Sequence, residues 1–427
     1  MTCAQDGRTA SMTDSYPIRA IAADEFEAFS EVPGEAFLES WPSGALAIER
    51  QIIEFDRTIA AFDGEQMVGT ATNFSFQLSL PGGMASAAGI SAVSVLPSHR
   101  RRGILTSMMR RLLADATGHG EALAILFASE SGIYGRHGFG LASWHQRLEI
   151  RHGEGKLAAG RMAAEPSRPR LRPADPAIAR AELAKVYDSA LSGRPGMLAR
   201  DDRWWTYFLT DPEYARAGMS QLRCLLADDE SGPRGYALYR TKPNWGADGL
   251  AAGTLRVKEL IATDPAAVAS LWADLLSRDL IGEVIAPLRP VDDPLLAILA
   301  DPRRARPWLS DGLWVRLIDL PTALRQRRYS AQVDVVVEVT DPAMPGNEGR
   351  WRLQADGPGD SQPSCGRTTA PADLRLPVQA LGAGYLGGAR LGQLAAAGHI
   401  HELTPGALAR LSTAMSWDPA PWSCMIF

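Results

Sequence analysis

The chain has few cysteines and no long apolar run, and both shortages limit what it can be. Its 427 residues include four cysteines, which lie far apart and form no Cys-x-x-Cys pair. Neither a zinc site nor a disulfide framework is therefore indicated. No apolar stretch approaches the roughly 20 residues of a membrane span, and residues 1–15 lack the apolar core of a signal peptide. We expect a cytoplasmic protein with a flexible leader at residues 1–15 and no membrane partner.

The chain also lacks an excess of positive charge. It carries 44 Lys and Arg against 49 Asp and Glu, a formal net charge of -5. This balance argues against a nucleic-acid partner, because such binding depends on neutralising phosphates. It mildly favours a cationic small substrate, which an acidic cleft would attract. The histidines are scattered without ligand spacing, so no metal site is predicted.

The composition is that of a folded protein with more than one core. Hydrophobic residues make up 46% of the chain and charged residues 22%, as in ordinary folded domains. A chain of this length is expected to form two to three domains. A linker rich in Gly and Pro covers about residues 151–176.

Periodicity predicts similar element orders on both sides of this linker. The first region reads as a helix over residues 18–37 and a hairpin around Asp63-Gly64. Its predicted strands lie at residues 58–62, 67–75, 92–96 and 124–129. The last two strands flank a helix, which predicts a parallel βαβ unit.

The second region repeats the order helix, hairpin, strand and helix, which suggests an internal duplication. These elements are predicted at residues 178–192, 222–227 with 235–239, 255–262 and 265–278. The third region begins near Gly312 and is predicted to hold strands and short helices. They lie at residues 313–317, 322–327, 333–339 and 404–415.

The most informative stretch runs from Gly89 to Gly140. The strand predicted at residues 92–96 is followed by the turn Arg100–Gly103, which leads into an amphipathic helix. The start of a helix presents about four free N–H groups and a dipole that favours an anion. Gly103 would let a diphosphate approach the backbone, and the arginines would add charge-assisted contacts. Taken alone, the turn is equally well a surface turn with solvated arginines. The flanking strands and Tyr134 favour the anion site.

This stretch resembles the GNAT superfamily of N-acetyltransferases, in which a Q/R-x-x-G-x-G/A loop binds the pyrophosphate of acetyl-CoA. Arg100 and Gly103 match that loop, whereas Leu105 stands where Gly or Ala is usual. The departure at Leu105 and the segment Ala128–Phe139 resemble one branch, the Eis (enhanced intracellular survival) family. The segment Asp311–Arg316 and the terminal Phe427 extend that resemblance over most of the chain.

The resemblance implies an α+β (mixed α/β) fold with tandem GNAT acetyltransferase folds and a sterol-carrier-protein-like C-terminal domain. The catalytic domain is expected at residues 16–150, a second, degenerate GNAT-like domain at 151–311, and the third domain at 312–427. The resemblance also implies an acyltransferase that uses acetyl-CoA and no metal, and a homohexamer. The acceptor is expected to be an amine of a small polyamine-type molecule such as an aminoglycoside, attacking directly in a ternary complex.

The resemblance further assigns roles to residues. Tyr134 would act as general acid toward the leaving thiolate, and the terminal carboxylate of Phe427 as general base. An amine with a pKa of about 10.4 arrives protonated, so it needs such a base or a water relay. The residues implied to bind the cofactor are Val93, Ser94, Val95, Arg100, Arg101, Arg102, Gly103, Ile104, Leu105, Thr106, Ser129 and Glu130. Without the resemblance, a packed tyrosine and a frayed chain end are the commoner interpretations.

The acceptor is less well defined. Candidate acceptor contacts are Glu39, Ala92, Trp204, Trp205 and Ile426. Core packing is the commoner use of paired tryptophans, and a solvated helix face that of Glu39. Ala92 replaces a bulky aromatic of the best-known family member and Ile426 a carboxylate, which weakens the case for broad aminoglycoside acetylation but not for acetyl transfer. Two alternatives remain, a protein or peptide lysine acetyltransferase and a non-catalytic acyl-CoA or lipid-binding module.

Overall fold

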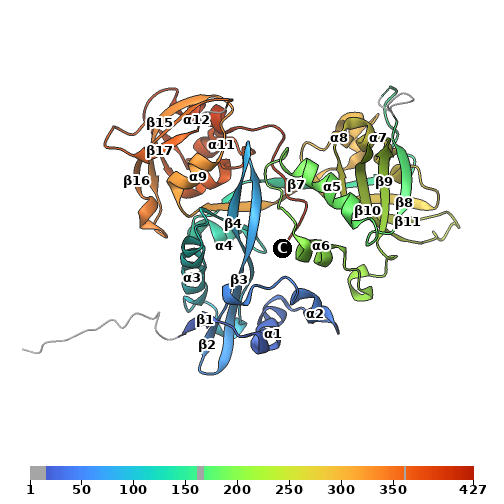
Figure 1. The fold of residues 1–427 in the computed structure, drawn as a ribbon, viewed down its shortest axis with the longest axis horizontal. Helices are drawn as coiled ribbons and strands as arrows, with labels where there is room; N and C mark the ends of the chain where they lie inside the picture. The colour runs from blue at the N-terminus through green and yellow to red at the C-terminus, as the bar shows by residue number, and fades with distance from the viewer. Residues whose placement is uncertain (1–15, 161–167, 360–361) are drawn as a thin grey trace, which may run out of the picture. The chain divides into compact units, whose positions relative to one another are not determined.

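The computed structural model describes residues 16–160, 168–359 and 362–427 (Figure 1). The predicted leader and part of the predicted linker lie outside the described residues. The chain divides into two compact units, which are described one at a time. The first holds the residues up to Ser75 together with Ala88–Gly120, and the second holds Phe76–Ala87 together with Glu121–Phe427.

The first unit is an antiparallel sheet with three helices. Its elements are β1 (Ile18–Ala20), α1 (Phe26–Phe37), α2 (Ala45–Glu49), β2 (Thr58–Asp63), α3 (Ile104–Gly118) and the greater part of β3 (Gln66–Leu80) and β4 (Gly83–Val95). The predicted hairpin around Gly64 is confirmed, since β2 and β3 pair antiparallel there. The helix predicted over residues 18–37 is wrong at its start. Ile18–Ala20 pair with β2 instead, because backbone pairing with a distant strand overrides local periodicity.

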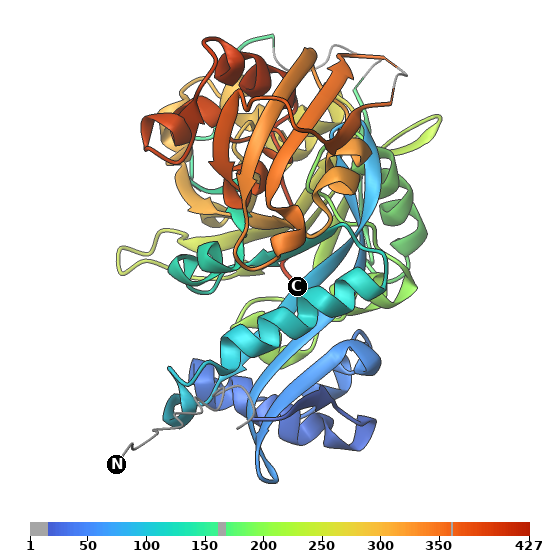
Figure 2. The same cartoon turned by 90° about the vertical axis from the view of Figure 1, so that its left-hand side faces the viewer.

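The predicted amphipathic helix is α3, which begins directly after Gly103. Its residues Ile104, Met108 and Leu112, four apart, are all buried. They face β3 at Gly69, where an added Cβ would lie 3.0 Å from the Ile104 side chain. This close approach holds the start of α3 against the sheet (Figure 2).

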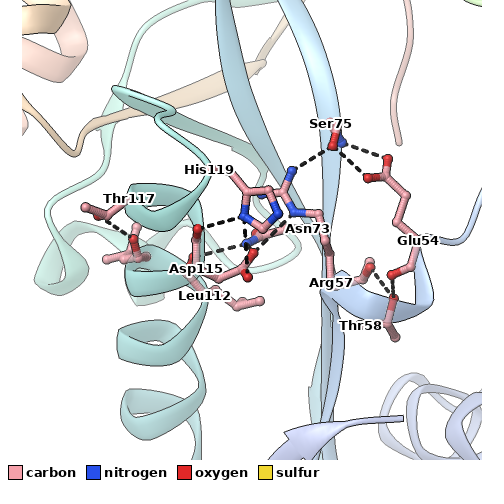
Figure 3. A network of polar contacts seen from close by, with 11 residues as sticks. Glu54, Arg57, Thr58, Asn73, Ser75, Leu112, Asp115, Thr117 and His119 are labelled. Carbon is pink, nitrogen blue, oxygen red and sulfur yellow. Dashed lines mark hydrogen bonds and ion pairs between the residues drawn. The ribbon is translucent and has the colours of Figure 1, made fainter. Parts of the chain in front are cut away.

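A polar network secures the other end of α3 (Figure 3). The buried Arg57 guanidinium donates to Asp115 of α3 at 3.2 Å and to Ser75 of β3 at 2.7 Å. The Asn73 amide donates to the same Asp115 carboxylate at 3.1 Å and to the Leu112 carbonyl at 3.0 Å. The helix is therefore fixed to β3 at both ends, which leaves little freedom in the turn that precedes it.

The second unit contains a seven-stranded sheet in the order β13-β7-β12-β11-β10-β9-β8. Its strands are β7 (Trp144–Arg151), β8 (Arg170–Ala174), β9 (Arg223–Asp229), β10 (Gly232–Lys242), β11 (Gly253–Ala262), β12 (Ile281–Pro290) and β13 (Trp308–Asp311). The helices are α5 (Arg180–Leu191), α6 (Asp202–Leu209), α7 (Pro265–Leu276) and α8 (Pro294–Ile298). β9 and β10 form the predicted hairpin. β11 and β12 are parallel to each other, and α7 lies between them in the sequence.

The second unit also contains the strands that carry the Tyr134 region and a five-stranded sheet, β17-β16-β15-β18-β19. The elements of the Tyr134 region are β5 (Leu123–Phe127), α4 (Ser131–Tyr134), β6 (Gly140–Leu141) and β14 (Leu313–Leu317). The five-stranded sheet and the helices along the same part of the chain are α9 (Leu320–Gln326), β15 (Gln332–Thr340), β16 (Gly349–Asp356), β17 (Ser364–Arg367), β18 (Leu374–Pro377), α10 (Val378–Gly384), α11 (Leu391–Ala396), β19 (His401–Glu402) and α12 (Ala407–Met415).

Two strands join sheets other than those expected. Residues 144–151, placed mostly in the first region, pair with β12 of the following sheet. Residues 313–317, expected to open the third region, pair with β5 and β6. Periodicity predicted the strand at residues 313–317 but not the one at residues 144–151. A strand carries no local signal for which distant strand it will pair with, so the sheet of neither strand could be predicted.

Candidate active site

The end of β4 has an irregular backbone. Ala92 adopts a positive φ of 50°, which in a strand marks a bulge that re-aims the following residues. The Thr70 hydroxyl donates to the Ala92 carbonyl at 3.0 Å and lies 2.6 Å from the hydroxyl of Ser94. The side chain of Ser94 is therefore engaged within the sheet, so any ligand contact of Ser94 must come from its backbone.

The turn before α3 is open at its centre. Arg101 and Gly103 have φ angles of 63° and 83°, the left-handed region that glycine adopts without strain. A Cβ at Gly103 would have nothing within 4 Å. No side chain caps α3, and its first helical bond runs from the Ser107 N–H to the Gly103 carbonyl. The N–H groups of Ile104–Thr106 are thus left as donors for an anion.

The three arginines of this turn are not equivalent. Arg100 donates to the Ala36 carbonyl at the end of α1 at 3.2 Å. Arg102 donates to the Tyr16 hydroxyl at 2.8 Å, a bond that raises the pKa of the arginine. Arg101 makes no such contact with any part of the chain that the structure describes. Arg101 is therefore the guanidinium most available to a phosphate.

A residue outside the predicted set supports the turn. The imidazole of His99 is buried, and its Nε2 lies 3.1 Å from Asp63 at the tip of the β2–β3 hairpin. Its Nδ1 lies 2.9 Å from the Ser98 hydroxyl. A histidine in a turn gives no local sign of burial, because its partner stands 36 residues earlier in the sequence.

Tyr134 ends α4 in the second unit and is 5% exposed. Burial raises the pKa of its phenol, a hydrogen bond with Ser129 lowers it, and the charge of Glu130 raises it, with a net increase. The hydrogen bond with Ser129 joins two hydroxyl groups, either of which can be the donor. The structure thus brings Tyr134, Ser129 and Glu130 together, as their shared segment implied.

The third sheet's helix α10 holds the turn that contains Tyr134. The Gln379 amide donates to the Gly135 carbonyl at 2.7 Å. A Cβ at Gly140 would lie 2.0 Å from the Gln379 carbonyl, so backbone meets backbone here and only glycine fits. The fully buried Arg316 of β14 lies against Gly138, 2.5 Å from where its Cβ would be. Neither Gln379 nor Arg316 was predicted as a support of the site, because both contacts span about 180 residues or more.

The chain ends against the strand that leads to Tyr134. The Phe427 ring lies 4.7 Å from that of Phe76 and 5.7 Å from that of Phe127, measured between centroids. Phe127 is the last residue of β5, two positions before Ser129. Met425 is buried, whereas Ile426 is 59% exposed. The terminal residue is thus packed beside the end of β5.

The paired tryptophans of α6 have different surroundings. Trp204 packs against Phe76 at 5.0 Å, the same ring that contacts Phe427. Trp205 is 3% exposed and packs in a core with Tyr187 and Arg200. Trp204 is as deeply buried, at 2% exposed, so burial does not separate the two rings, and the role of both as acceptor contacts stays a prediction.

A large groove in the first unit is strongly acidic. It has a volume of about 1430 Å³ and runs between α1, β1 and the tip of the β2–β3 hairpin. Among the described residues that line it, the carboxylates are Asp24, Glu25, Glu31, Glu35, Glu39 and Glu65, and the one basic residue is Arg19, which pairs with Glu25 at 2.6 Å. Glu39, a predicted acceptor contact, therefore lies on a surface that attracts cations.

The helix that follows β11 has a different start from α3. At the start of α7 the Asp264 carboxylate accepts from the N–H groups of Ala266 and Ala267 at 2.9 and 3.0 Å. Pro265 removes another donor, and Arg234 pairs with Asp264 at 2.7 Å. This helix N-terminus is capped by a carboxylate of the chain itself, so it cannot bind a phosphate as the α3 turn could.

Neither a metal-ligand cluster nor a membrane-spanning helix is found in the described part of the chain. Among residues 16–160, 168–359 and 362–427, no group of three or more His, Cys, Asp and Glu residues could hold a metal ion. Within the same ranges, no helix is both long and apolar enough to cross a bilayer.

Comparison with known proteins assigns the class. Residues 17–142 and 196–317 each match an acetyltransferase (GNAT) domain model, and residues 320–424 match a sterol carrier protein domain. The protein is therefore an acyltransferase built from two GNAT domains and a sterol-carrier-like domain. The fold class predicted from sequence is confirmed, and the inferred duplication corresponds to the second GNAT domain.

Individual relatives narrow the class to a family. An N-acetyltransferase of Streptomyces coelicolor is 44% identical over 89% of this chain and 92% of its own. The N-acetyltransferase Eis of Mycobacterium tuberculosis is 32% identical over 86% of this chain and 89% of its own. The crystal structure of Eis1 from Mycobacterium abscessus matches 96% of this chain and all of that one, with a TM-score of 0.82 at 30% identity. The chain belongs to the Eis family of GNAT N-acetyltransferases.

Proposed function

We propose that the protein transfers the acetyl group of acetyl-CoA to an amine of a small polycationic acceptor, such as an aminoglycoside, by direct attack in a ternary complex. The observation that carries this proposal is the contrast between two helix starts. The α3 turn has open space at Gly103 and an unengaged Arg101, whereas Asp264 closes the start of α7. Only the former suits the pyrophosphate of the cosubstrate.

In the proposed reaction, separate groups of the protein bind the pyrophosphate, polarise the acetyl carbonyl, accept a proton from the amine and protonate the thiolate. The N–H groups after Gly103 and the Arg101 guanidinium bind the pyrophosphate. The backbone of Val93–Val95 pairs with the pantetheine and polarises the acetyl carbonyl. The carboxylate of Phe427 accepts the proton of the attacking amine, and the Tyr134 phenol protonates the leaving thiolate. A free α-carboxylate has a pKa of about 3.5, so this base requires a shielded environment or a water relay.

The acidic groove supports a cationic acceptor. Six carboxylates and one guanidinium line it, and such a surface raises the local concentration of a polycation. A thiol-release screen with acetyl-CoA against polyamines, aminoglycosides, monoamines and lysine peptides tests the proposal, with products identified by mass spectrometry. We expect the polycations to give the highest kcat/KM, with a decrease as ionic strength rises.

Neutralising the groove sharpens this test. A Glu31→Gln, Glu35→Gln, Glu39→Gln variant should raise the KM for polycations and leave that for acetyl-CoA unchanged. Glu213→Gln, which removes one negative charge at an exposed site outside the groove, serves as the control.

Acetylation confined to protein lysines would favour a lysine acetyltransferase instead. Tight acetyl-CoA binding with no thiol release for any amine would favour a binding module. A cytoplasmic location and a homohexamer stay predictions.

A further inference from the structure

The C-terminal tail is seated in the second GNAT domain. The Trp422 N–H donates to the Pro195 carbonyl at 2.8 Å, and a Cβ at Gly196 would lie 3.1 Å from the Trp422 backbone. Trp422 and Cys424 are 3% and 4% exposed. They belong to the core cluster of this domain, together with Tyr187, Met197, Trp205, Leu226, Tyr236 and Leu238. The tail is thus an internal part of a domain whose sequence ended more than 100 residues earlier.

Beneath the tail lies an ion pair with no exposed surface. The Arg200 guanidinium donates to both Glu259 oxygens at 3.0 and 2.6 Å, and both side chains are 0% exposed. The Tyr236 hydroxyl donates to the same carboxylate at 2.6 Å. The guanidinium also faces the rings of Phe208 and Tyr187, at 3.8 and 4.1 Å from their centroids. This pair is therefore rigidly held from several sides.

Cys424 connects the tail to this pair. Its sulfur accepts from the Arg200 guanidinium at 3.7 Å, and its thiol donates to the Tyr187 hydroxyl at 3.5 Å. Burial raises the pKa of the Cys424 thiol to about 12, so at neutral pH the sulfur carries no charge that could compete with Glu259. The tail thus meets the pair through one neutral side chain.

The position of the pair suggests what it is for. Burying two charges costs more than burying apolar residues of the same size, so a buried pair is weak evidence for stability alone. In the domain that holds it, Asp264 closes the start of α7. What the pair does contact is the tail, and three residues after Cys424 the chain ends against Phe76 and Phe127.

We propose that Arg200 and Glu259 form a positioning pair that seats the C-terminal tail through Cys424 and thereby fixes the terminal carboxylate for proton transfer. The second GNAT domain then serves as the receptor of the tail. The catalytic half of this inference rests on the proposed base role of Phe427; the seating half does not.

The test compares two variants with a matched control. Arg200→Met removes the cation of the pair and leaves Glu259 buried without its counter-charge, which destabilises the domain. Cys424→Ala keeps the pair and removes the contact on the tail, so it tests the seating without that cost. Arg278→Met is the control, because Arg278 also binds an acid and a tyrosine in this domain, Asp274 at 2.6 Å and Tyr239 at 2.6 Å, away from the tail. Each full-length protein is assayed for release of Phe427 by a carboxypeptidase and for kcat and KM.

We expect Phe427 to be released about tenfold faster or more in both variants, because proteolysis follows the population of the open form. kcat should fall about 10- to 100-fold, the range for a displaced catalytic group, with the KM for acetyl-CoA within about twofold. The control should change neither quantity. Unchanged protection of Phe427 in both variants would overturn the inference. Faster release with unchanged kcat would support the seating and contradict the base role of Phe427, and with it the proposed mechanism.

Discussion

Tyr134 combines two properties that a general acid needs. Burial keeps the phenol protonated, and a hydrogen bond with Ser129 holds its hydroxyl group. A thiolate leaves more readily when a proton is supplied at the same time. The residue is also held from outside its own segment, since Gln379 fixes the Gly135 carbonyl.

The electrostatics of Tyr134 predict a shift in pH dependence. The phenol acts as an acid only while protonated, so kcat should fall as the pH rises through its raised pKa. Glu130 contributes to that increase, so Glu130→Gln should move the alkaline limb of the kcat profile to lower pH. Tyr134→Phe should remove the limb and lower kcat by about 100-fold. Glu213→Gln, an exposed change elsewhere, should leave the profile in place; an unmoved limb in Glu130→Gln would count against the acid role.

The arginines before α3 should differ in their effect on cosubstrate binding. Arg101 has no partner in the described chain, whereas Arg102 already donates to Tyr16. A hydrogen bond to a charged group contributes about 1.5–3 kcal/mol, so Arg101→Ala should weaken binding of coenzyme A by about tenfold or more. Arg102→Ala should have a smaller effect. Isothermal titration at fixed salt measures both, and an equal loss in the two variants would refute the distinction.

At the scale of elements, α3 and α7 occupy equivalent places in the two GNAT domains but differ in whether their N-termini are open to an anion. α3 follows β4 through an open glycine turn, and α7 follows β11 through an aspartate and a proline. The dipole of both helices favours an anion at the start. In α7 the chain's own Asp264 satisfies that preference, whereas no side chain caps the start of α3.

This contrast predicts the binding stoichiometry. Titration should give about one molecule of acetyl-CoA per chain, because the α7 start is capped by its own carboxylate. The same titration with Arg101→Ala should show weaker binding at that one site and no residual tight site. Two equivalent sites per chain would contradict the interpretation of the second domain.

At the scale of the whole molecule, the two later domains support residues that catalysis is proposed to use. α10 of the sterol-carrier-like domain packs its backbone against β6 and holds the Tyr134 turn. The second GNAT domain holds the tail that ends at Phe427. An acetyltransferase fold alone would lack both supports, which gives the two additional domains a physical purpose.

The position of the terminus predicts the effect of lengthening the chain. Adding a few residues after Phe427 converts its carboxylate to an amide and displaces the end of the tail. Turnover should fall by about 100-fold or more, the contribution of a general base, with little change in acetyl-CoA affinity. The same residues added before Met1 serve as the control. An undiminished kcat in the lengthened protein would exclude the terminal carboxylate as base.

Local features of this protein were predictable because neighbours in sequence produce them. The four-residue spacing of Ile104, Met108 and Leu112 marks α3, and Gly103 marks its start. The hairpin around Gly64 follows from a turn dipeptide. The shared segment of Tyr134 and Ser129 brings their hydroxyl groups within hydrogen-bonding reach.

The supports of the site were not predictable because they join residues far apart. Gln379 reaches Gly135 across 244 positions, and Arg200 meets Cys424 across 224. The burial of Trp205 around Arg200 depends on the same core. The local sequence around each of these residues gives no sign of such a contact, because the partner lies far away in the sequence.

The sequence by itself therefore determined the class of this protein, an acetyltransferase with duplicated GNAT domains, because a turn, a helix period and a motif are local. The tertiary structure alone decided which helix start is open, which arginine is unengaged and how the chain end is held. Those properties depend on packing and charge contacts between distant segments, and such contacts form only when the chain is folded.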